Sequence, residues 1–187
     1  MKSKSRIGNR IIIILFVIVL FVLIYQGYFV FMRQLYPTKY EDFVGQYSAQ
    51  YGLPEEFVYA VIHCESGFRP DAHRYDTGAS GLMQILPGTF SWLQTKTGEQ
   101  LPDENIFDPQ TNIRYGCLYL SMNLEDYGSL ELAAAAYHAG GGNVDKWLAD
   151  GEYSKDGVTL EHIPFGDTGR YVEKVMKVCE MYKNLYF

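Results

Sequence analysis

A long apolar stretch near the N-terminus places the strongest constraint on how this chain can fold. Residues Ile11 to Met32 are interrupted only by Gln26, Gly27 and two tyrosines. A helix rises about 1.5 Å per residue, so this stretch would measure roughly 33 Å, enough to cross a hydrocarbon core of about 30 Å. We therefore predict a transmembrane helix over 11–32, preceded by a cytoplasmic segment, 1–10, and followed by a linker, 33–40.

The residues around this stretch predict its orientation. Basic residues precede it at four positions and follow it at one, so the positive-inside rule keeps the N-terminus in the cytoplasm and the rest of the chain outside. The block 11–24 also resembles the apolar core of a signal peptide. Because no small-x-small cleavage site follows and no cysteine stands nearby to accept lipid, we expect an uncleaved anchor, with a cleaved signal peptide as the alternative.

Charge is distributed unevenly along the chain. Five of the 16 basic residues precede Lys39, whereas all 22 acidic residues follow it, which leaves the outward part with a net charge of −11 at neutral pH. So acidic a domain lacks the basic surface that binds nucleic acid, and we exclude a nucleic-acid partner. With 48% hydrophobic residues, the chain has enough apolar side chains for a packed core.

The part of the chain after the linker, 41–187, is expected to form one mainly α-helical domain. Apolar residues recur at helical spacing, and proline or glycine stands where the helices should begin or end. No hairpin signature or strand pattern is found. The expected helices cover 40–51, 54–65, 109–127, 130–138, 143–147 and 171–182, with long loops over 67–86 and 150–167.

Glu65 is the leading candidate for a catalytic residue. It lies four residues beyond Val61 and eight beyond Phe57, so it shares their apolar stripe instead of the solvated face of the helix. Desolvation of a carboxyl group favours its neutral form and raises its pKa, which suits a general acid near neutral pH. The ordinary alternative is a glutamate at a frayed helix end.

Three later blocks of sequence combine turn-forming glycines with polar or aromatic residues. Each has an ordinary structural explanation when taken singly, because glycine serves turns, proline serves helix starts and alanine serves close packing. The blocks are Gly78–Ile85 (GASGLMQI), Ala136–Val144 (AYHAGGGNV) and Ile163–Val172 (IPFGDTGRYV).

Together with the sequence Glu65-Ser66-Gly67-Phe68, these blocks resemble the soluble-type lytic transglycosylases, whose domain has a goose-lysozyme-like fold. The resemblance runs from about residue 41 to residue 187. It implies that Glu65 is the catalytic acid and that other matched positions bind substrate. The implied substrate-binding residues are Ser80, Met83, Gln84 beside the acid, Tyr137 near the reacting sugar, His138, Ala139, and Tyr171 opposite the acid.

Two positions depart from the family's pattern. His138 stands where asparagine is usual, and Asp167 stands where glutamate is usual. Histidine keeps a hydrogen-bond donor but changes the reach of the side chain and adds a titratable group. Both departures bear on contact geometry and on pH optimum, and neither changes the acid.

The resemblance also implies a reaction. Family members cut the β-1,4 bond between N-acetylmuramic acid and N-acetylglucosamine in peptidoglycan, with one carboxyl group acting first as acid and then as base to form a 1,6-anhydro ring. Two alternatives stay open. One is a hydrolytic muramidase that uses Asp71, Asp76 or Asp167 as a second acid, and the other is a module that binds peptidoglycan without cutting it.

The cysteines and histidines indicate neither thiol chemistry nor a metal site. Cys64 follows His63 but lies on an apolar stripe, which disfavours a thiol peptidase that would pair it with His138. Cys117 and Cys179 also lie on apolar stripes, where a small buried hydrophobe is the plain interpretation, although a bridge between them is open outside the cytoplasm. The four histidines lack zinc-ligand spacing, so no metal or other cofactor is expected.

Overall fold

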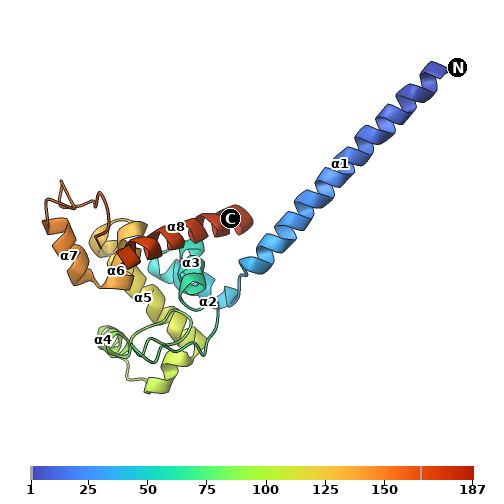
Figure 1. Cartoon of the computed structure of the whole chain (residues 1–187). Helices are drawn as coiled ribbons and strands as arrows, with labels where there is room; N and C mark the ends of the chain where they lie inside the picture. The colour runs from blue at the N-terminus through green and yellow to red at the C-terminus, as the bar shows by residue number, and fades with distance from the viewer. Residues whose placement is uncertain (1, 165) are drawn as a thin grey trace. The chain divides into compact units, whose positions relative to one another are not determined.

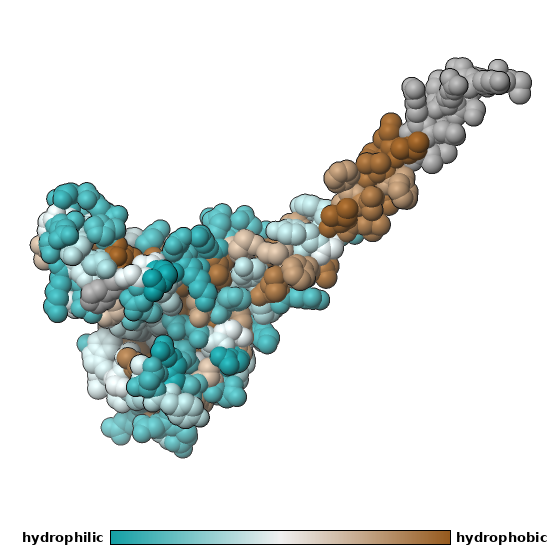
Figure 2. Space-filling model, in the orientation of Figure 1, coloured by the Kyte–Doolittle hydropathy of each residue, from teal (hydrophilic) through white to brown (hydrophobic). Residues whose placement is uncertain are grey.

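The computed structural model describes residues 2–164 and 166–187 and divides into two units, Met1–Pro37 and Thr38–Phe187 (Figure 1). Helix α1 (Lys2–Leu35) forms the first unit. Among the described residues, one helical stretch, Ile13–Leu35, is long and apolar enough to cross a membrane. Figure 2 shows hydrophobic residues over much of this stretch, and most of its side chains are exposed. The helix continues through Leu35, into the segment expected to be linker.

The second unit is a bundle of helices, which confirms the expected mainly helical fold. Helices α3 and α6 pack on α8, while α5 packs on α2 and α6. No strand forms in the described residues, where two isolated bridges join His73 to Ser80 and Ser80 to Ile85. The elements are α2 (Glu41–Tyr51), α3 (Glu55–Glu65), α4 (Pro87–Thr97), η1 (Asp103–Phe107), α5 (Pro109–Tyr127), α6 (Leu130–Ala139), α7 (Gly141–Ala149) and α8 (Gly166–Tyr186).

Local signals in the sequence explain the ends of the two central helices. Asp108 accepts a hydrogen bond from the Thr111 amide at 2.8 Å at the start of α5, and Gly128 ends that helix in the left-handed region. Ser129 caps α6 in the same way. The run Ala133–Ala136 is fully buried, because its small side chains let α6 approach the helices on either side of it.

Helices α4, η1 and α8 differ from the sequence-based expectation, and α7 is longer than expected by two residues at each end. Helix α4 has no counterpart among the expected helices, because Phe90 and Leu93 are its only buried apolar residues and so few make a weak periodic signal. Helix α8 begins at Gly166, five residues before the expected start at Tyr171. The buried residue of its first turn is Thr168, which is 1% exposed. Because threonine is polar, a pattern of apolar residues does not include it.

Helix α5 holds the loop 67–86 in a fixed conformation through the buried side chain of Asn112. Its Nδ2 donates to the carbonyl oxygens of Ser80 at 3.1 Å and Ile106 at 2.7 Å, and its Oδ1 accepts from the Met83 amide at 2.7 Å. The Ser66 hydroxyl, at the end of α3, donates to the Leu82 carbonyl at 2.7 Å. The loop is thereby tied both to α5 and to the helix that carries Glu65.

Candidate active site

Glu65 is the last residue of α3, and its side chain faces α8. The Tyr171 hydroxyl donates a hydrogen bond to Glu65 Oε1 at 2.6 Å. Burial raises the pKa of the Glu65 carboxyl to about 7, while the Tyr171 hydrogen bond and the positive charges of Lys174 and Arg74 act in the opposite direction. The direction of this pKa shift is the one predicted from the apolar stripe of the helix. A carboxyl group in this state can both donate and accept a proton near neutral pH.

Tyr137 joins the end of α6 to the loop 67–86. Its hydroxyl donates to the Met83 carbonyl at 2.7 Å, and its ring centroid lies 5.2 Å from that of Tyr119 on α5. Burial and the neighbouring Glu65 raise the pKa of the Tyr137 phenol well above its ordinary value, so it stays a neutral hydrogen-bond donor.

Gln84 adopts a backbone conformation that is unusual for a residue with a side chain. Its φ is +51°, in the left-handed region, and its Nε2 donates to the carbonyl oxygens of Ala72 at 3.1 Å and Gly81 at 2.9 Å. Such strain costs about 1 kcal/mol or more and tends to be retained at functional sites. The two hydrogen bonds hold the half-buried side chain of Gln84 beside the pocket described next.

A pocket of about 230 Å³ brings four of the expected substrate-binding residues together, namely Gln84, Tyr137, His138 and Ala139. Glu65 and Tyr171 stand next to it, since the His138 ring stacks on the Tyr171 ring with 4.4 Å between centroids. We call this pocket with Glu65 and Tyr171 the cleft. Its remaining lining residues are Ile85, Leu86, Thr89, Tyr119 and Gly140.

Two expected substrate-binding residues have buried side chains. Ser80 is 3% exposed and exchanges a hydrogen bond of 2.9 Å with His73 Nδ1. Met83 is fully buried, with its sulfur against Gly116 of α5. Met83 acts on the site through its carbonyl oxygen, which receives the Tyr137 hydroxyl. A direct substrate contact by either side chain stays a prediction.

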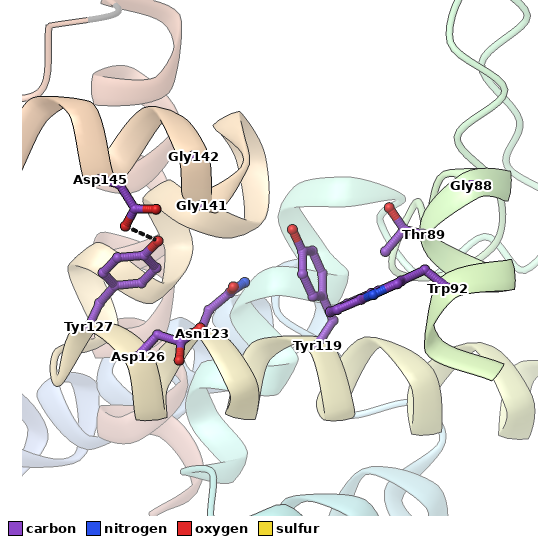
Figure 3. A pocket seen from close by; sticks show the side chains of 10 residues that line it. All are labelled: Gly88, Thr89, Trp92, Tyr119, Asn123, Asp126, Tyr127, Gly141, Gly142 and Asp145. Carbon is purple, nitrogen blue, oxygen red and sulfur yellow. Dashed lines mark hydrogen bonds between the residues drawn. The ribbon is translucent and has the colours of Figure 1, made fainter. Parts of the chain in front are cut away.

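A second pocket of about 400 Å³ continues from the cleft, and we call it the distal groove (Figure 3). It shares Thr89 and Tyr119 with the cleft. Figure 3 shows Tyr119, Asn123 and Tyr127 rising from α5 between α7 and α4. Trp92 of α4 is 41% exposed here. Its ring lies edge to face with the ring of Tyr119, with 6.2 Å between the two centroids.

The sequence reasoning missed the distal groove. Asn123 lines this groove, although its side chain is almost fully buried, at 5% exposure. Tyr119 and Asn123 are spaced i, i+4 on α5, a signal that could have placed both on one face. Trp92 lies on α4, which the sequence pattern does not reveal.

The candidates for a second acid lie on the surface. Asp71, Asp76 and Asp167 are all exposed. Asp76 pairs with Arg74 at 3.0 Å, and that hydrogen bond lowers the pKa of the Asp76 carboxyl. Asp167 accepts a hydrogen bond from the Thr168 amide at 2.9 Å, at the start of α8. In these contacts, none of the three carboxyl groups interacts directly with Glu65.

The cysteines do not form a reactive or bridged site. Cys64, Cys117 and Cys179 are all free, so the open alternative of a Cys117–Cys179 bridge is not realised. Burial raises the pKa of the Cys64 thiol to about 11, which keeps it protonated and removes the basis for a thiol nucleophile. Within residues 2–164 and 166–187, no group of three or more metal-ligating side chains comes together.

Comparison with known proteins agrees with the fold and the motifs. The family model of the transglycosylase SLT domain matches residues 42–157, and the chain belongs to this family. It is 32% identical over 157 residues to the soluble lytic murein transglycosylase of Escherichia coli (strain K12), a match that covers 81% of this chain and 24% of that protein. The membrane-bound lytic murein transglycosylase C of Yersinia pestis (strain Pestoides F) is 30% identical over 172 residues, covering 78% and 47%.

The solved structures are similar in fold. The crystal structure of the 70 kDa soluble lytic transglycosylase from Escherichia coli aligns with a TM-score of 0.73 at 28% identity, covering 82% of this chain and 25% of that one. The chain thus spans about a quarter of the length of the Escherichia coli relative. The expected family and the lysozyme-like fold are confirmed, while the family match ends before α8, which carries Tyr171.

Proposed function

We propose that this chain is a membrane-anchored lytic transglycosylase that cuts the β-1,4 bond between N-acetylmuramic acid and N-acetylglucosamine in peptidoglycan. The observation that carries the proposal is the half-buried Glu65 carboxyl, whose pKa is raised to about 7 and which Tyr171 holds beside a polar, aromatic cleft. The membership of the SLT family gives the class of substrate.

In the first step, protonated Glu65 gives its proton to the glycosidic oxygen, and the bond from that oxygen to C1 of the muramic acid breaks. The positive charge left at C1 is stabilised by the sugar's own 2-acetamido group, so no second carboxylate is needed. The exposed positions of Asp71, Asp76 and Asp167 favour this route over the hydrolytic one.

In the second step, ionised Glu65 takes the proton of the 6-hydroxyl of the same sugar. The freed oxygen bonds to C1 and closes the 1,6-anhydro ring, and Glu65 ends protonated, ready for another cycle. The Tyr171 hydrogen bond stabilises the carboxylate between the two steps, because hydrogen bonds to a charged group favour the charged form. Water is not consumed, so the reaction is that of a lyase.

The distal groove provides room for further sugars of the strand. Trp92 and Tyr119 offer aromatic surface for the apolar faces of pyranose rings. The groove continues from the cleft through shared residues, as a linear polymer requires. Other parts of the proposed active site, including Ser80, Met83 and Ala139, would shape the cleft around the reacting sugar.

The anchor is proposed as one helix with the N-terminus in the cytoplasm and residues 41–187 as a catalytic domain outside. The apolar stretch Ile13–Leu35 supports a span, and the basic residues before it support this orientation. A relative named as membrane-bound is consistent with the proposal. The enzyme would then act on peptidoglycan close to the membrane surface.

Digestion of purified peptidoglycan tests the function. We expect the full-length protein to release muropeptides with 1,6-anhydro ends, lighter by one water than reducing ends on a mass spectrum. The variant Glu65→Gln should fold but cleave slower by a factor of hundreds or more, because amide cannot give or take the proton. Glu152→Gln, at an exposed loop position, serves as the matched control and should be fully active.

Each other outcome of this digest counts against the proposal. Fragments with reducing ends alone would indicate the hydrolytic muramidase. Bound but uncut peptidoglycan would indicate the binding module. Full activity of a folded Glu65→Gln variant, checked by circular dichroism, would remove Glu65 from its role.

A further inference from the structure

The stack between His138 and Tyr171 is a feature of this chain that the proposed reaction does not itself require. The two ring centroids are 4.4 Å apart and the ring planes are inclined by 25°. His138 Nδ1 also shares a hydrogen bond of 3.1 Å with Thr168 Oγ1. Asparagine, the residue usual at this position in the resembling family, has no ring with which to cover a tyrosine.

The contacts of His138 restrict the ring from two directions. His138 lies near the end of α6, next to Tyr137, whose hydroxyl is bonded to the Met83 carbonyl. Thr168 and Tyr171 are one turn apart on α8 and therefore lie on one face of that helix. Thr168 is 1% exposed, and its hydrogen bond holds the edge of the imidazole while the ring stacks on Tyr171.

Tyr171 in turn is the direct hydrogen-bond donor to Glu65. The distance from its hydroxyl to Glu65 Oε1 is 2.6 Å, and the hydroxyl is at the far end of a long side chain. A small rotation of the ring moves the hydroxyl out of hydrogen-bond range. Whatever packs on the face of this ring therefore controls whether the hydrogen bond to Glu65 is made.

We propose that His138 is a positioning residue that stacks on Tyr171 and thereby keeps the Tyr171 hydroxyl bonded to the Glu65 carboxylate. The catalytic consequence of this contact rests on the function proposed above, whereas the contact itself does not. The Tyr171 hydrogen bond is the largest influence that lowers the pKa of Glu65 against burial. Losing the stack should therefore leave Glu65 protonated up to a higher pH.

Other charged groups around these residues do not replace this effect. Lys174 of α8 and Arg74 of the loop 67–86 also lower the pKa of Glu65, and both remain when His138 is changed. Tyr137 of α6 and Cys64 of α3 are neutral neighbours of the carboxyl. Among the charges that face His138 are Asp167, which raises its pKa, and Arg74, which lowers it.

Partial burial favours the neutral form of the His138 ring. Burial of its ring is the largest influence on its pKa and lowers it from the ordinary value of 6.5. A neutral imidazole stacks on tyrosine without adding a charge near the carboxyl. The effect of replacing His138 is therefore expected through Tyr171 and not through a lost positive charge.

The test is a titration of Glu65 by carbon-13 NMR in the full-length protein in detergent micelles. Glutamate is labelled at its carboxyl carbon, and the Glu65 signal is identified by its loss in Glu65→Gln. In His138→Ala, we expect Glu65 to titrate at a higher pH than in the wild type. His138→Phe keeps a ring on Tyr171 and should titrate close to the wild type, and His162→Ala, at an exposed histidine elsewhere, should not change.

The same variants give a second readout in the peptidoglycan digest. We expect His138→Ala to lower the rate at saturating substrate roughly tenfold. The alkaline limb of the pH–rate profile should shift to higher pH, as the NMR titration of Glu65 does. His138→Phe should recover most of that rate. A change in KM alone would mean that His138 serves substrate binding only, and it would contradict the positioning role.

Two NMR results would overturn the proposal: an unchanged Glu65 titration in folded His138→Ala, or a titration of His138→Phe that matches His138→Ala. Circular dichroism melting of both variants checks folding. His138 is only partly buried, so both should fold. If the wild type cuts no glycan, the proposed function fails while the NMR titration still decides the role of His138. The two failures are thus distinguishable.

Discussion

At the scale of single residues, Glu65 shows how opposing forces set one protonation equilibrium. Burial favours the neutral acid, whereas the Tyr171 hydroxyl, Lys174 and Arg74 favour the carboxylate, and the balance is a pKa of about 7. Near neutral pH both forms are then well populated. A residue that must act first as acid and then as base benefits from that balance, because neither form is costly to reach.

The raised pKa of Glu65 predicts a dependence of stability on pH. The folded chain holds this proton up to about pH 7, whereas the unfolded chain releases it near the ordinary value of 4.5. Between these values the folded state binds more protons, so the free energy of unfolding falls as pH rises, by about 3 kcal/mol in total. Glu65→Gln should lack this decrease.

Urea unfolding of the wild type and Glu65→Gln at pH 4.5 and pH 8 measures the difference. Other titrating groups act on both proteins and cancel in the comparison. We expect the variant to gain stability relative to the wild type at pH 8. An equal difference at both pH values would mean that Glu65 has an ordinary pKa.

At the scale of elements, the loop 67–86 and α5 form one support for the cleft. Asn112 binds three backbone groups from its buried position on α5, and the loop then presents Gln84 and the carbonyl of Met83 to the site. Gly81 has no side chain, and this leaves room for the Asn112 side chain beside the loop. A loop bound in this way behaves as part of the scaffold, which suits residues that must hold a sugar in a fixed orientation.

Gly81→Ala tests this support. The residue has a φ of +78°, and an added Cβ would lie 2.3 Å from Asn112 Nδ2 and 2.6 Å from the Ile106 carbonyl oxygen. Backbone strain and overpacking together should lower the free energy of unfolding by about 2–5 kcal/mol. Gly88→Ala is the control, because no atom lies within 4 Å of its added Cβ.

Chemical denaturation of the two variants gives the comparison. The Gly88→Ala change should stay within about 1 kcal/mol of the wild type, since glycine and alanine differ by that amount in a helix. A similar stability of Gly81→Ala and Gly88→Ala would mean that the contact between Gly81 and Asn112 does not hold the loop in place.

At the scale of the whole molecule, the chain consists of two units with different surfaces. In the first unit, the described side chains from residue 13 onward are almost all exposed and largely apolar, as the proposed anchor requires. The second unit has its own buried core, from Val44 on α2 to Leu185 on α8. The core of the second unit contains no described residue of the first, so we predict that the second unit folds without it.

Removal of residues 1–37 tests this division. The chain from Thr38 onward should be soluble without detergent and should melt with the same transition as the helical unit in the full-length protein. The full-length protein should be found in the membrane fraction of cells. Full-length protein in the medium would contradict the uncleaved anchor, and an unfolded fragment would contradict the independence of the second unit.

The features that the sequence determined by itself are those set by neighbours along the chain. The apolar stretch, the capped helices α5 and α6 and the position of Glu65 on an apolar stripe all follow from local spacing and propensity, and the motifs indicated the family. A short helix such as α4, with few apolar residues, produced too weak a pattern to be predicted.

The family resemblance places Tyr171 opposite the acid, but only the tertiary structure decided the contacts that the residues around Glu65 make. Tyr171 comes 106 positions after Glu65, and its hydroxyl reaches the carboxyl because α8 packs on α3. The distal groove likewise joins α4, α5 and α7, and the stack of His138 joins α6 to α8. Periodicity along one helix says which face is buried but not which helix covers it, so the neighbours of Glu65, and with them its pKa, depend on how the helices pack.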